Sequence, residues 1–204
     1  MILSLDTSSE RLGISIFNEE KQLLYHLSIY KLKPFSEILV KKLDDIFKEL
    51  SLNKREIKKV VVCKGVGSYT GLRVGLSVAK SIAYALNIPI YTYDSLSVLA
   101  YKYKYTNGNI LIGINAGKGE VYSQSFKVSL EDIKPLSNIN LAKLKDFEVE
   151  ISNYNLVVVK NLKISGNNVI NDLEDLSVIG CIYSLEKNLS EDVFIVEPIY
   201  IRGL

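Results

Sequence analysis

Apolar and polar positions follow a strand pattern through the first thirty residues. Residues 1–5 form a nearly continuous apolar run, and residues 12–17 and 23–30 alternate between apolar and polar side chains. Polar turn residues separate the three runs. Short runs of this kind joined by turns are typical of hairpins. The pattern therefore predicts a three-stranded antiparallel meander.

A helical period replaces the alternation from residue 36. Apolar residues recur at spacings of three and four as far as residue 50, which predicts an amphipathic helix capped by Ser36. Val40 lies off the main apolar stripe and is a candidate for a second contact surface. We expect a strand at 59–64, a second helix ending near Asn87, a strand at 88–91 and a helix over 95–103. This alternation predicts a mixed sheet with helices packed against it.

The second half of the chain repeats the opening in weaker form. A strand at 109–114, a polar turn that begins with Asn115 and an alternating segment at 120–126 resemble the first hairpin. Further on we expect a helix near 138–147, a strand at 156–159, a helix near 172–188 and an extended segment at 193–201. The chain is thus predicted to be an α/β protein of two related lobes, residues 1–104 and a smaller lobe at 105–204.

The sequence from residue 65 to residue 75 joins the strand at 59–64 to the second helix. Gly65 and Gly67 permit a tight turn that displays Ser68, Thr70 and Arg73. The spacing does not match a P-loop, a dinucleotide-binding fingerprint or a nucleophile elbow, because the required lysine and glycines are missing. We therefore interpret the segment as a strand-to-helix turn rather than a nucleotide loop.

The helix after this turn carries a stripe of small residues. Gly71, Gly75, Ala79 and Ala83 follow one another at intervals of four, so they lie on one side of the helix. Glycine costs about 1 kcal/mol in a helix relative to alanine, which indicates a packing reason for the stripe. We expect the stripe to be a docking surface for a helix of another molecule.

Composition limits the classes of function. Hydrophobic residues make up 48% of the chain and charged residues 24%, and the net charge of +2 is too small to favour non-specific nucleic-acid binding. One histidine and two distant cysteines do not form a metal-binding or disulfide pattern. The chain enters a strand at its first residues and has no apolar run long enough for a membrane, so we expect a cytoplasmic protein without metal or cofactor.

One polar turn offers candidate chemistry. Asp6, Thr7 and Ser8 end the first strand, and a carboxylate with hydroxyl groups could hold magnesium and phosphate. The matching turn in the second half has the uncharged Asn115, so a second carboxylate is missing. An Asx-turn that closes the hairpin is the favoured interpretation. Tyrosines interleaved with lysines at 101–105 could stack on nucleic acid, but a partly packed connection is favoured.

Several of these segments together resemble the TsaB (YeaZ) family, over nearly the whole chain. The segments are Leu5-Asp6-Thr7-Ser8, Ser36-Glu37, residues 65–75, Glu120-Val121-Tyr122 and Pro198-Ile199-Tyr200-Ile201-Arg202. The resemblance implies the two-lobed fold of actin, Hsp70 and sugar kinases (the ASKHA fold). In such a fold Asp6, Thr7 and Ser8 would be a vestigial nucleotide or metal site.

The resemblance also implies a function without catalysis. Members of this family support synthesis of the threonylcarbamoyl group on the adenosine next to the anticodon of tRNA. They bind the catalytic TsaD subunit, are joined by the ATPase TsaE, form homodimers when alone, and meet tRNA through the complex. The expected partner surface comprises Glu37, Ile38, Val40, Gly71, Arg73, Gly75 and Ala79.

The sequence departs from the family pattern at a few positions. Phe35 replaces the usual histidine before Ser36-Glu37, and Asn115 and Gly117 replace charged residues in the second lobe. The loss of charge weakens the alternative of a nucleotide-dependent phosphotransferase that uses Asp6.

Overall fold

Two compact units make up the computed structural model, which describes residues 1–201. Unit 1 comprises Met1–Tyr93 and Glu174–Pro198, and unit 2 comprises Asp94–Leu173 and, of the described chain, residues 199–201. This division differs from the expected one, because unit 2 already starts at Asp94 and residues 174–198 return to unit 1. Arg202, in the C-terminal motif, lies outside the described residues.

Unit 1 is built on a six-stranded sheet with the order β12-β5-β4-β1-β2-β3. Its strands are β1 (Ile2–Asp6), β2 (Arg11–Phe17), β3 (Leu23–Tyr30), β4 (Lys59–Gly65), β5 (Ile90–Asp94) and β12 (Ser190–Glu191). β1 pairs antiparallel with β2, and β2 with β3, so the predicted meander is confirmed. β4 runs parallel to β1.

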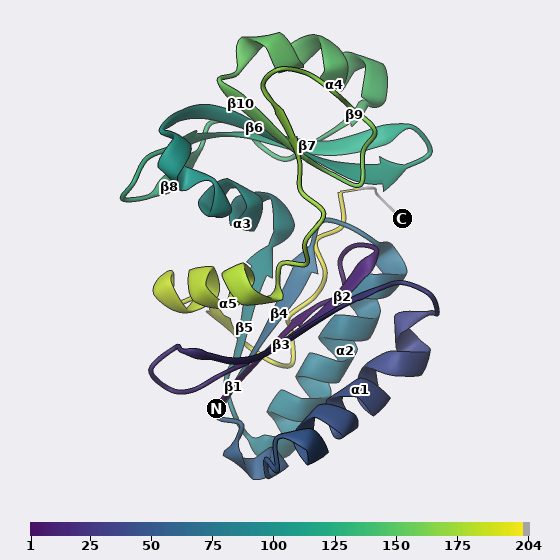
Figure 1. The fold of residues 1–204 in the computed structure, drawn as a ribbon, viewed down its shortest axis with the longest axis vertical. Helices are drawn as coiled ribbons and strands as arrows, with labels where there is room; N and C mark the ends of the chain where they lie inside the picture. The colour runs from purple at the N-terminus through teal and green to yellow at the C-terminus, as the bar shows by residue number, and fades with distance from the viewer. Residues whose placement is uncertain (202–204) are drawn as a thin grey trace. The chain divides into compact units, whose positions relative to one another are not determined.

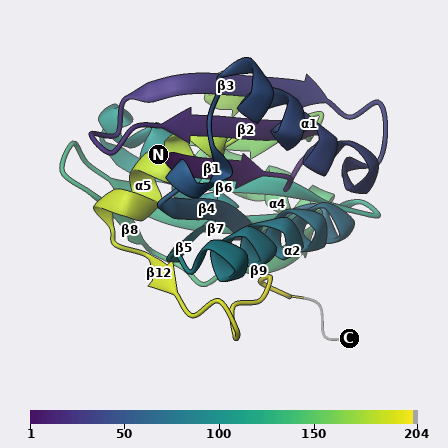
Figure 2. The ribbon, with the colours of Figure 1, turned by 90° about the horizontal axis from the view of Figure 1, so that it is seen from below.

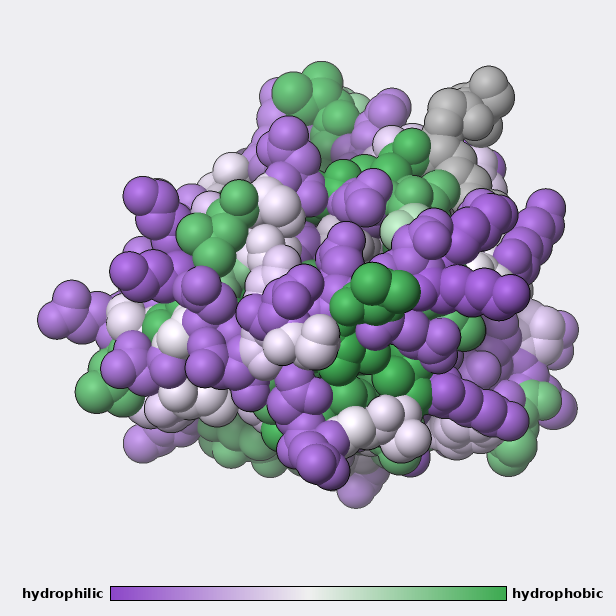
Figure 3. All heavy atoms as spheres, turned by 90° about the horizontal axis from the view of Figure 1, so that it is seen from above, coloured by the Kyte–Doolittle hydropathy of each residue, from purple (hydrophilic) through white to green (hydrophobic). Residues whose placement is uncertain are grey.

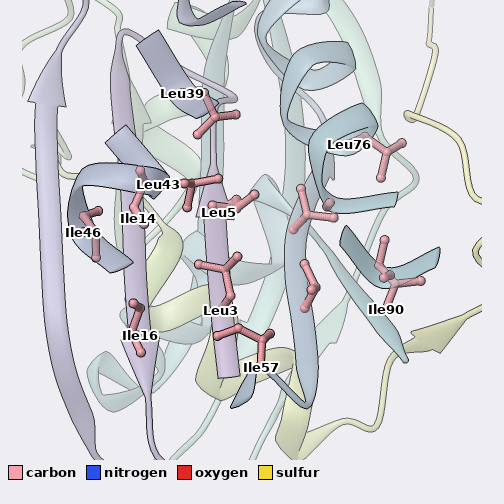
Figure 4. Packing of buried hydrophobic residues seen from close by; sticks show 14 of the residues in the cluster. Leu3, Leu5, Ile14, Ile16, Leu39, Leu43, Ile46, Ile57, Leu76 and Ile90 are labelled. Carbon is pink, nitrogen blue, oxygen red and sulfur yellow. The ribbon is translucent and has the colours of Figure 1, made fainter. Parts of the chain in front are cut away.

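Helices α1 (Phe35–Glu49) and α2 (Tyr69–Leu86) belong to the apolar core of unit 1. Leu39 and Leu43 of α1 point toward Leu5 and Ile14 of the sheet (Figure 4). Pro34 precedes the first turn of α1 and no side chain caps it, so the expected cap at Ser36 is wrong. A 3-10 turn (Lys54–Glu56) leads into β4.

Helix α5 (Ser177–Glu186) covers a second side of this sheet through contacts with β1, β2 and β4. Its partners on the strands are small polar residues. The hydroxyl of Ser4 donates to the Ser177 carbonyl at 2.6 Å, and the hydroxyls of Ser15 and Ser177 are 2.6 Å apart. Strands β1, β2 and β4 are thus buried on both faces, which explains why residues 174–198 join this unit.

Unit 2 repeats the strand order of unit 1. Its sheet has the order β11-β10-β6-β7-β8, with β9 also paired to β7. The strands are β6 (Gly108–Gly117), β7 (Glu120–Val128), β8 (Ile133–Pro135), β9 (Asn140–Lys143), β10 (Leu156–Lys160) and β11 (Val169–Asn171). The central strands β6, β7 and β10 take the places of β1, β2 and β4. The two related halves predicted from the sequence are therefore present, in a two-lobed α/β fold (Figure 1).

The helices of unit 2 are shorter than expected. They are α3 (Ser95–Lys102) and α4 (Leu144–Glu150), with 3-10 turns at Lys104–Thr106 and Ile151–Asn153. The helix expected over 138–147 begins only at Leu144, because residues 140–143 pair with β7 as β9. The helix expected over 172–188 begins at Ser177, and residues 193–195 form a turn.

Large apolar side chains remain exposed in both units. Figure 3 shows one face on which hydrophobic residues gather in separate patches between hydrophilic ones. Val40 of unit 1 is 63% exposed and Val149 of unit 2 is 76% exposed. No helix among residues 1–201 combines the length and the hydropathy needed to cross a membrane.

Candidate functional site

Asp6, Thr7 and Ser8 are buried and occupied by partners within unit 1. Oδ1 of Asp6 accepts hydrogen bonds from the backbone N–H of Ser8 at 2.9 Å and its hydroxyl at 2.7 Å. Oδ2 accepts the N–H of Leu176, the residue before α5, at 2.6 Å. Burial raises the pKa of Asp6 above its usual range, although these hydrogen bonds oppose the shift. Asp6 thus closes an Asx-turn and also accepts a hydrogen bond from the residue that precedes α5.

The turn at Asn115 copies this geometry in unit 2. Oδ1 of Asn115 accepts the N–H of Gly117 at 2.8 Å, and its amide donates to the Asn161 carbonyl at 2.9 Å. Asp6 and Asn115 therefore hold equivalent hairpin turns. Among residues 1–201, no three His, Cys, Asp or Glu side chains group closely enough to hold a metal ion.

The glycine-rich segment packs against the Asp6 turn. The N–H of Ser68 donates to the Ser8 carbonyl at 2.7 Å. A Cβ atom on Gly67 would lie 2.2 Å from the same carbonyl oxygen, and Gly67 has a φ of +155°, which favours glycine. Ser68 caps α2 by accepting the N–H of Gly71, while Thr70 in the first turn is exposed. The glycines thus bring the turn and α2 together.

The stripe of small residues on α2 faces the chain's own strands and turn. A Cβ atom on Gly71 would lie 2.0 Å from the Thr7 carbonyl oxygen, and one on Gly75 would lie 2.2 Å from Oγ1 of Thr7. Ala79 and Ala83 are buried in the core of unit 1. The expectation that Gly71, Gly75 and Ala79 contact a partner is therefore wrong. The close neighbour that requires small side chains is the hairpin turn after β1.

A groove between α1 and α2 is open at the surface of unit 1. It has a volume of about 670 Å³, and its lining residues come from both helices and the turn before β4. The apolar part of the lining is Val40, Leu43, Phe47, Val78 and Ile82, and the polar part is Lys41, Asp44, Lys54, Ser77 and Ser81. Leu43 and Phe47 are buried in the core at the base, whereas Val40 projects into solvent.

Charged residues stand at one side of the groove. Asp44 accepts from Lys48 at 2.6 Å and from Lys54 at 3.1 Å. The hydrogen bonds from Lys48 and Lys54 lower the pKa of Asp44. An apolar floor beside a paired rim is the usual anatomy of a protein–protein contact.

Of the partner residues expected from sequence, Val40 lines this groove. Glu37 is exposed in the first turn of α1 and Ile38 is partly buried. Arg73 is exposed on α2 with its guanidinium carbon 4.2 Å from the centroid of the Tyr69 ring. The partner residues expected from sequence did not include those of α2 that line the groove. Their signal was the apolar pair Val78 and Ile82, which lies beside Gly75 and Ala79 on the helix.

Comparisons with known proteins place the chain in a family. A family model described as TsaD, tRNA N6-adenosine threonylcarbamoyltransferase, matches residues 32–192. A Bacillus subtilis protein named tRNA threonylcarbamoyladenosine biosynthesis protein TsaB is 33% identical over 144 residues, which is 69% of this chain and 62% of that protein. A protein of the same name from Buchnera aphidicola (strain Sg) is 30% identical over 60% of this chain and 58% of its own length.

The solved structures agree on the fold. YeaZ from Pseudomonas aeruginosa superimposes with a TM-score of 0.76 over 98% of this chain and 99% of that one, at 15% identity. The sequence matches span less than two thirds of the B. subtilis and Buchnera proteins. The family model matches residues 32–192, which is most of this chain, and the match to the B. subtilis TsaB protein covers 69% of this chain, so the chain belongs to the TsaB (YeaZ) family.

Proposed function

We propose that this chain is a non-catalytic subunit in the synthesis of the threonylcarbamoyl group on tRNA adenosine. Its task is to dock a TsaD-like catalytic subunit. Family membership supports the pathway, since the relatives that match are named for threonylcarbamoyladenosine biosynthesis. The observation that carries the docking role is the open apolar groove between α1 and α2.

The partner surface proposed here consists of the groove together with Glu37 and Ile38 at the start of α1. Arg73 lies on the same helix as Val78 and can contact a partner that extends along α2. Apolar side chains at the centre of such a contact contribute most of the binding free energy, while paired charges at the rim contribute little. Val40 and Val78 are therefore the expected anchors.

The other expected partners belong to the same proposal. A TsaE-like ATPase joins the pair, a second copy of the chain covers the groove when the catalytic subunit is missing, and tRNA is bound by the complex rather than by this chain alone. The reaction then takes place in the cytoplasm, where tRNA is modified.

A phosphotransferase that uses Asp6 is the weaker alternative. Both carboxylate oxygens of Asp6 accept hydrogen bonds from the chain itself, and its side chain is buried. Magnesium would have to displace the N–H of Leu176. Calorimetry with magnesium and ATP tests this alternative, which requires binding that an Asp6→Ala variant loses.

The docking proposal is tested by one matched pair of substitutions. Val40→Glu places a charge in the groove, whereas Val149→Glu places the same charge at an exposed valine of unit 2. Binding of the TsaD-type protein from the same organism is measured by calorimetry. We expect Val40→Glu to weaken binding at least about tenfold, equivalent to about 1.4 kcal/mol, and Val149→Glu to leave it unchanged. Equal affinities for the two variants would refute the groove as the docking site.

A further inference from the structure

Strand β3 ends the sheet of unit 1 without the features that usually protect a sheet edge. Its sequence from Leu23 to Tyr30 is LLYHLSIY, which contains no Asp, Glu, Lys, Arg or Pro. Figure 2 shows β3 as the outermost strand of its sheet. Natural edge strands are normally short, charged, interrupted by proline or covered, because an open edge pairs with other strands. β3 is eight residues long.

The hydrogen-bonding pattern shows which residues of β3 present their backbone at this edge. The N–H of Lys31 donates to the Glu10 carbonyl at 2.7 Å, just beyond the β2–β3 ladder. Hydrogen-bonded and non-hydrogen-bonded pairs alternate along an antiparallel ladder. His26, Ser28 and Tyr30 therefore direct their backbone N–H and C=O groups away from β2.

We propose that β3 of a second copy of this chain pairs with β3 in antiparallel orientation, with Leu27 of the two copies opposite each other. This contact lies outside the groove between α1 and α2 and goes beyond the docking function proposed above. The identical strand is a suited occupant because it offers the same open N–H and C=O groups, and the imidazole of His26, the one basic side chain of the segment, binds Asp175 of its own chain at 2.9 Å.

The register follows from the side chains. With Leu27 on the two-fold axis, Tyr25 lies opposite Ile29 of the second copy, and these residues are partly buried on the side of β3 that packs on the apolar core. On the other side, His26 lies opposite Ser28 of the second copy. Apolar cross-strand pairs of this kind stabilise antiparallel strands.

Neighbouring registers are less favourable. If Ser28 were on the axis, Tyr25 would face Lys31 of the second copy. If His26 were on the axis, the two imidazoles would face each other and Lys31 would lie opposite Lys21. In the register centred on Leu27, Lys31 lies opposite Leu23 at the end of the strand and residues 24–30 pair without a lysine, so this register is the one that the strand itself favours.

The experiment starts from the Val40→Glu variant, so that pairing through the groove does not contribute. Sedimentation equilibrium between about 10 and 300 µM brackets the weak affinities expected of small interfaces. We expect this variant to dimerise. Adding Leu27→Lys, or in a separate protein Leu27→Glu, should give monomers, and an equimolar mixture of the two should restore dimers because opposite charges then meet at the axis.

Hydrogen exchange on the otherwise unchanged chain provides a measurement without a substitution in β3. The amides of His26, Ser28 and Tyr30 should exchange rapidly in dilute protein and slow at high concentration, while those of Leu27 and Ile29 stay slow throughout. A monomeric Val40→Glu variant at every concentration, or open-edge amides that stay unprotected in the dimer, would overturn the proposal.

The result of this test of β3 pairing is independent of the result for the groove between α1 and α2. Leu27→Lys should leave the affinity for the TsaD-type protein unchanged, because Leu27 does not line the groove. If the groove fails as a docking site, the edge is still tested by its own variants, and circular dichroism confirms that each variant is folded.

Discussion

Gly71 shows how a single small residue can be required by the chain's own fold. The helical backbone of α2 would favour alanine there by about 1 kcal/mol. A Cβ atom on residue 71 would nevertheless lie only 2.0 Å from the Thr7 carbonyl oxygen. Because this oxygen belongs to the backbone, it cannot rotate away as a side chain can. The packing requirement therefore outweighs the helix propensity.

We predict that Gly71→Ala lowers the free energy of unfolding by about 1–3 kcal/mol, the usual cost of an overpacked core. Gly75→Ala should cost less, because it meets the side chain of Thr7 rather than its backbone. Urea denaturation of both variants provides the measurement. A Gly71→Ala protein as stable as the unsubstituted chain would contradict the packing described above.

Asp172 is the centre of a buried ion cluster in unit 2. Its carboxylate accepts from Lys102 at 2.6 Å and from Tyr103 at 3.0 Å, and Lys160, which is 2% exposed, lies 3.6 Å away. Burial of Asp172 opposes ionisation, but the hydrogen bond from Lys102 and the charge of Lys160 lower its pKa below the usual 3.8.

The direction of this pKa shift fixes the pH dependence of stability. A carboxyl with a lowered pKa stabilises the folded state above its ordinary pKa, and that stabilisation is lost as the pH falls through the folded-state value. We predict that Asp172→Asn costs about 3 kcal/mol at pH 7, because Lys102 and the buried Lys160 both lose a negatively charged neighbour. The difference from the original chain should shrink as the pH falls below 3.8, as measured by urea unfolding across the pH range. A cost that is independent of pH would contradict this role of the carboxylate.

At the scale of elements, the position of α5 explains why the two units differ from the two lobes expected from the sequence. It follows the last strand of unit 2 along the sequence but packs on β1, β2 and β4 of unit 1. α3 does the reverse, since it follows β5 and contacts β6, β7 and β8 of unit 2. Each sheet is thus covered by a helix that directly follows a strand of the other sheet.

Gly180 is a point where α5 packs closely against Tyr93 of β5. A Cβ atom there would lie 2.4 Å from the ring of Tyr93, which is 1% exposed. We predict that Gly180→Ala destabilises unit 1 by about 1–3 kcal/mol, because neither the ring nor the helix can move aside in a packed core. Hydrogen exchange should show faster opening of α5 and β1. Normal protection of both elements would argue against tight docking of α5.

Sequence patterns predicted the elements of unit 1 better than those of unit 2. Helices α1 and α2 and the meander of unit 1 have long periodic sequences, and these elements were placed correctly to within a few residues. In unit 2, β8, β9 and β11 have three or four residues each, too few to show a period, and pairing with β7 and β10 decides their structure.

At the scale of the whole molecule, the proposed function requires a partner rather than a reaction at Asp6. We predict that cells depleted of this protein lose threonylcarbamoyladenosine from their tRNA. A gene encoding Val149→Glu should restore the modified nucleoside, whereas one encoding Val40→Glu should restore little of it. Mass spectrometry of nucleosides from digested tRNA provides the measurement. Full restoration by Val40→Glu, at equal protein levels, would show that the groove is dispensable.

The sequence by itself determined strands β1 to β5 and helices α1 and α2 of unit 1, the tight turn at residues 65–68 and the family, because local periods and turn residues are properties of the chain alone. Only the tertiary structure decided which side of α2 is free. A helix that is apolar around most of its circumference packs somewhere, and small residues show only that another group comes close. That group is the Thr7 turn of the same chain, so the open surface is the side of α2 that faces the groove with α1.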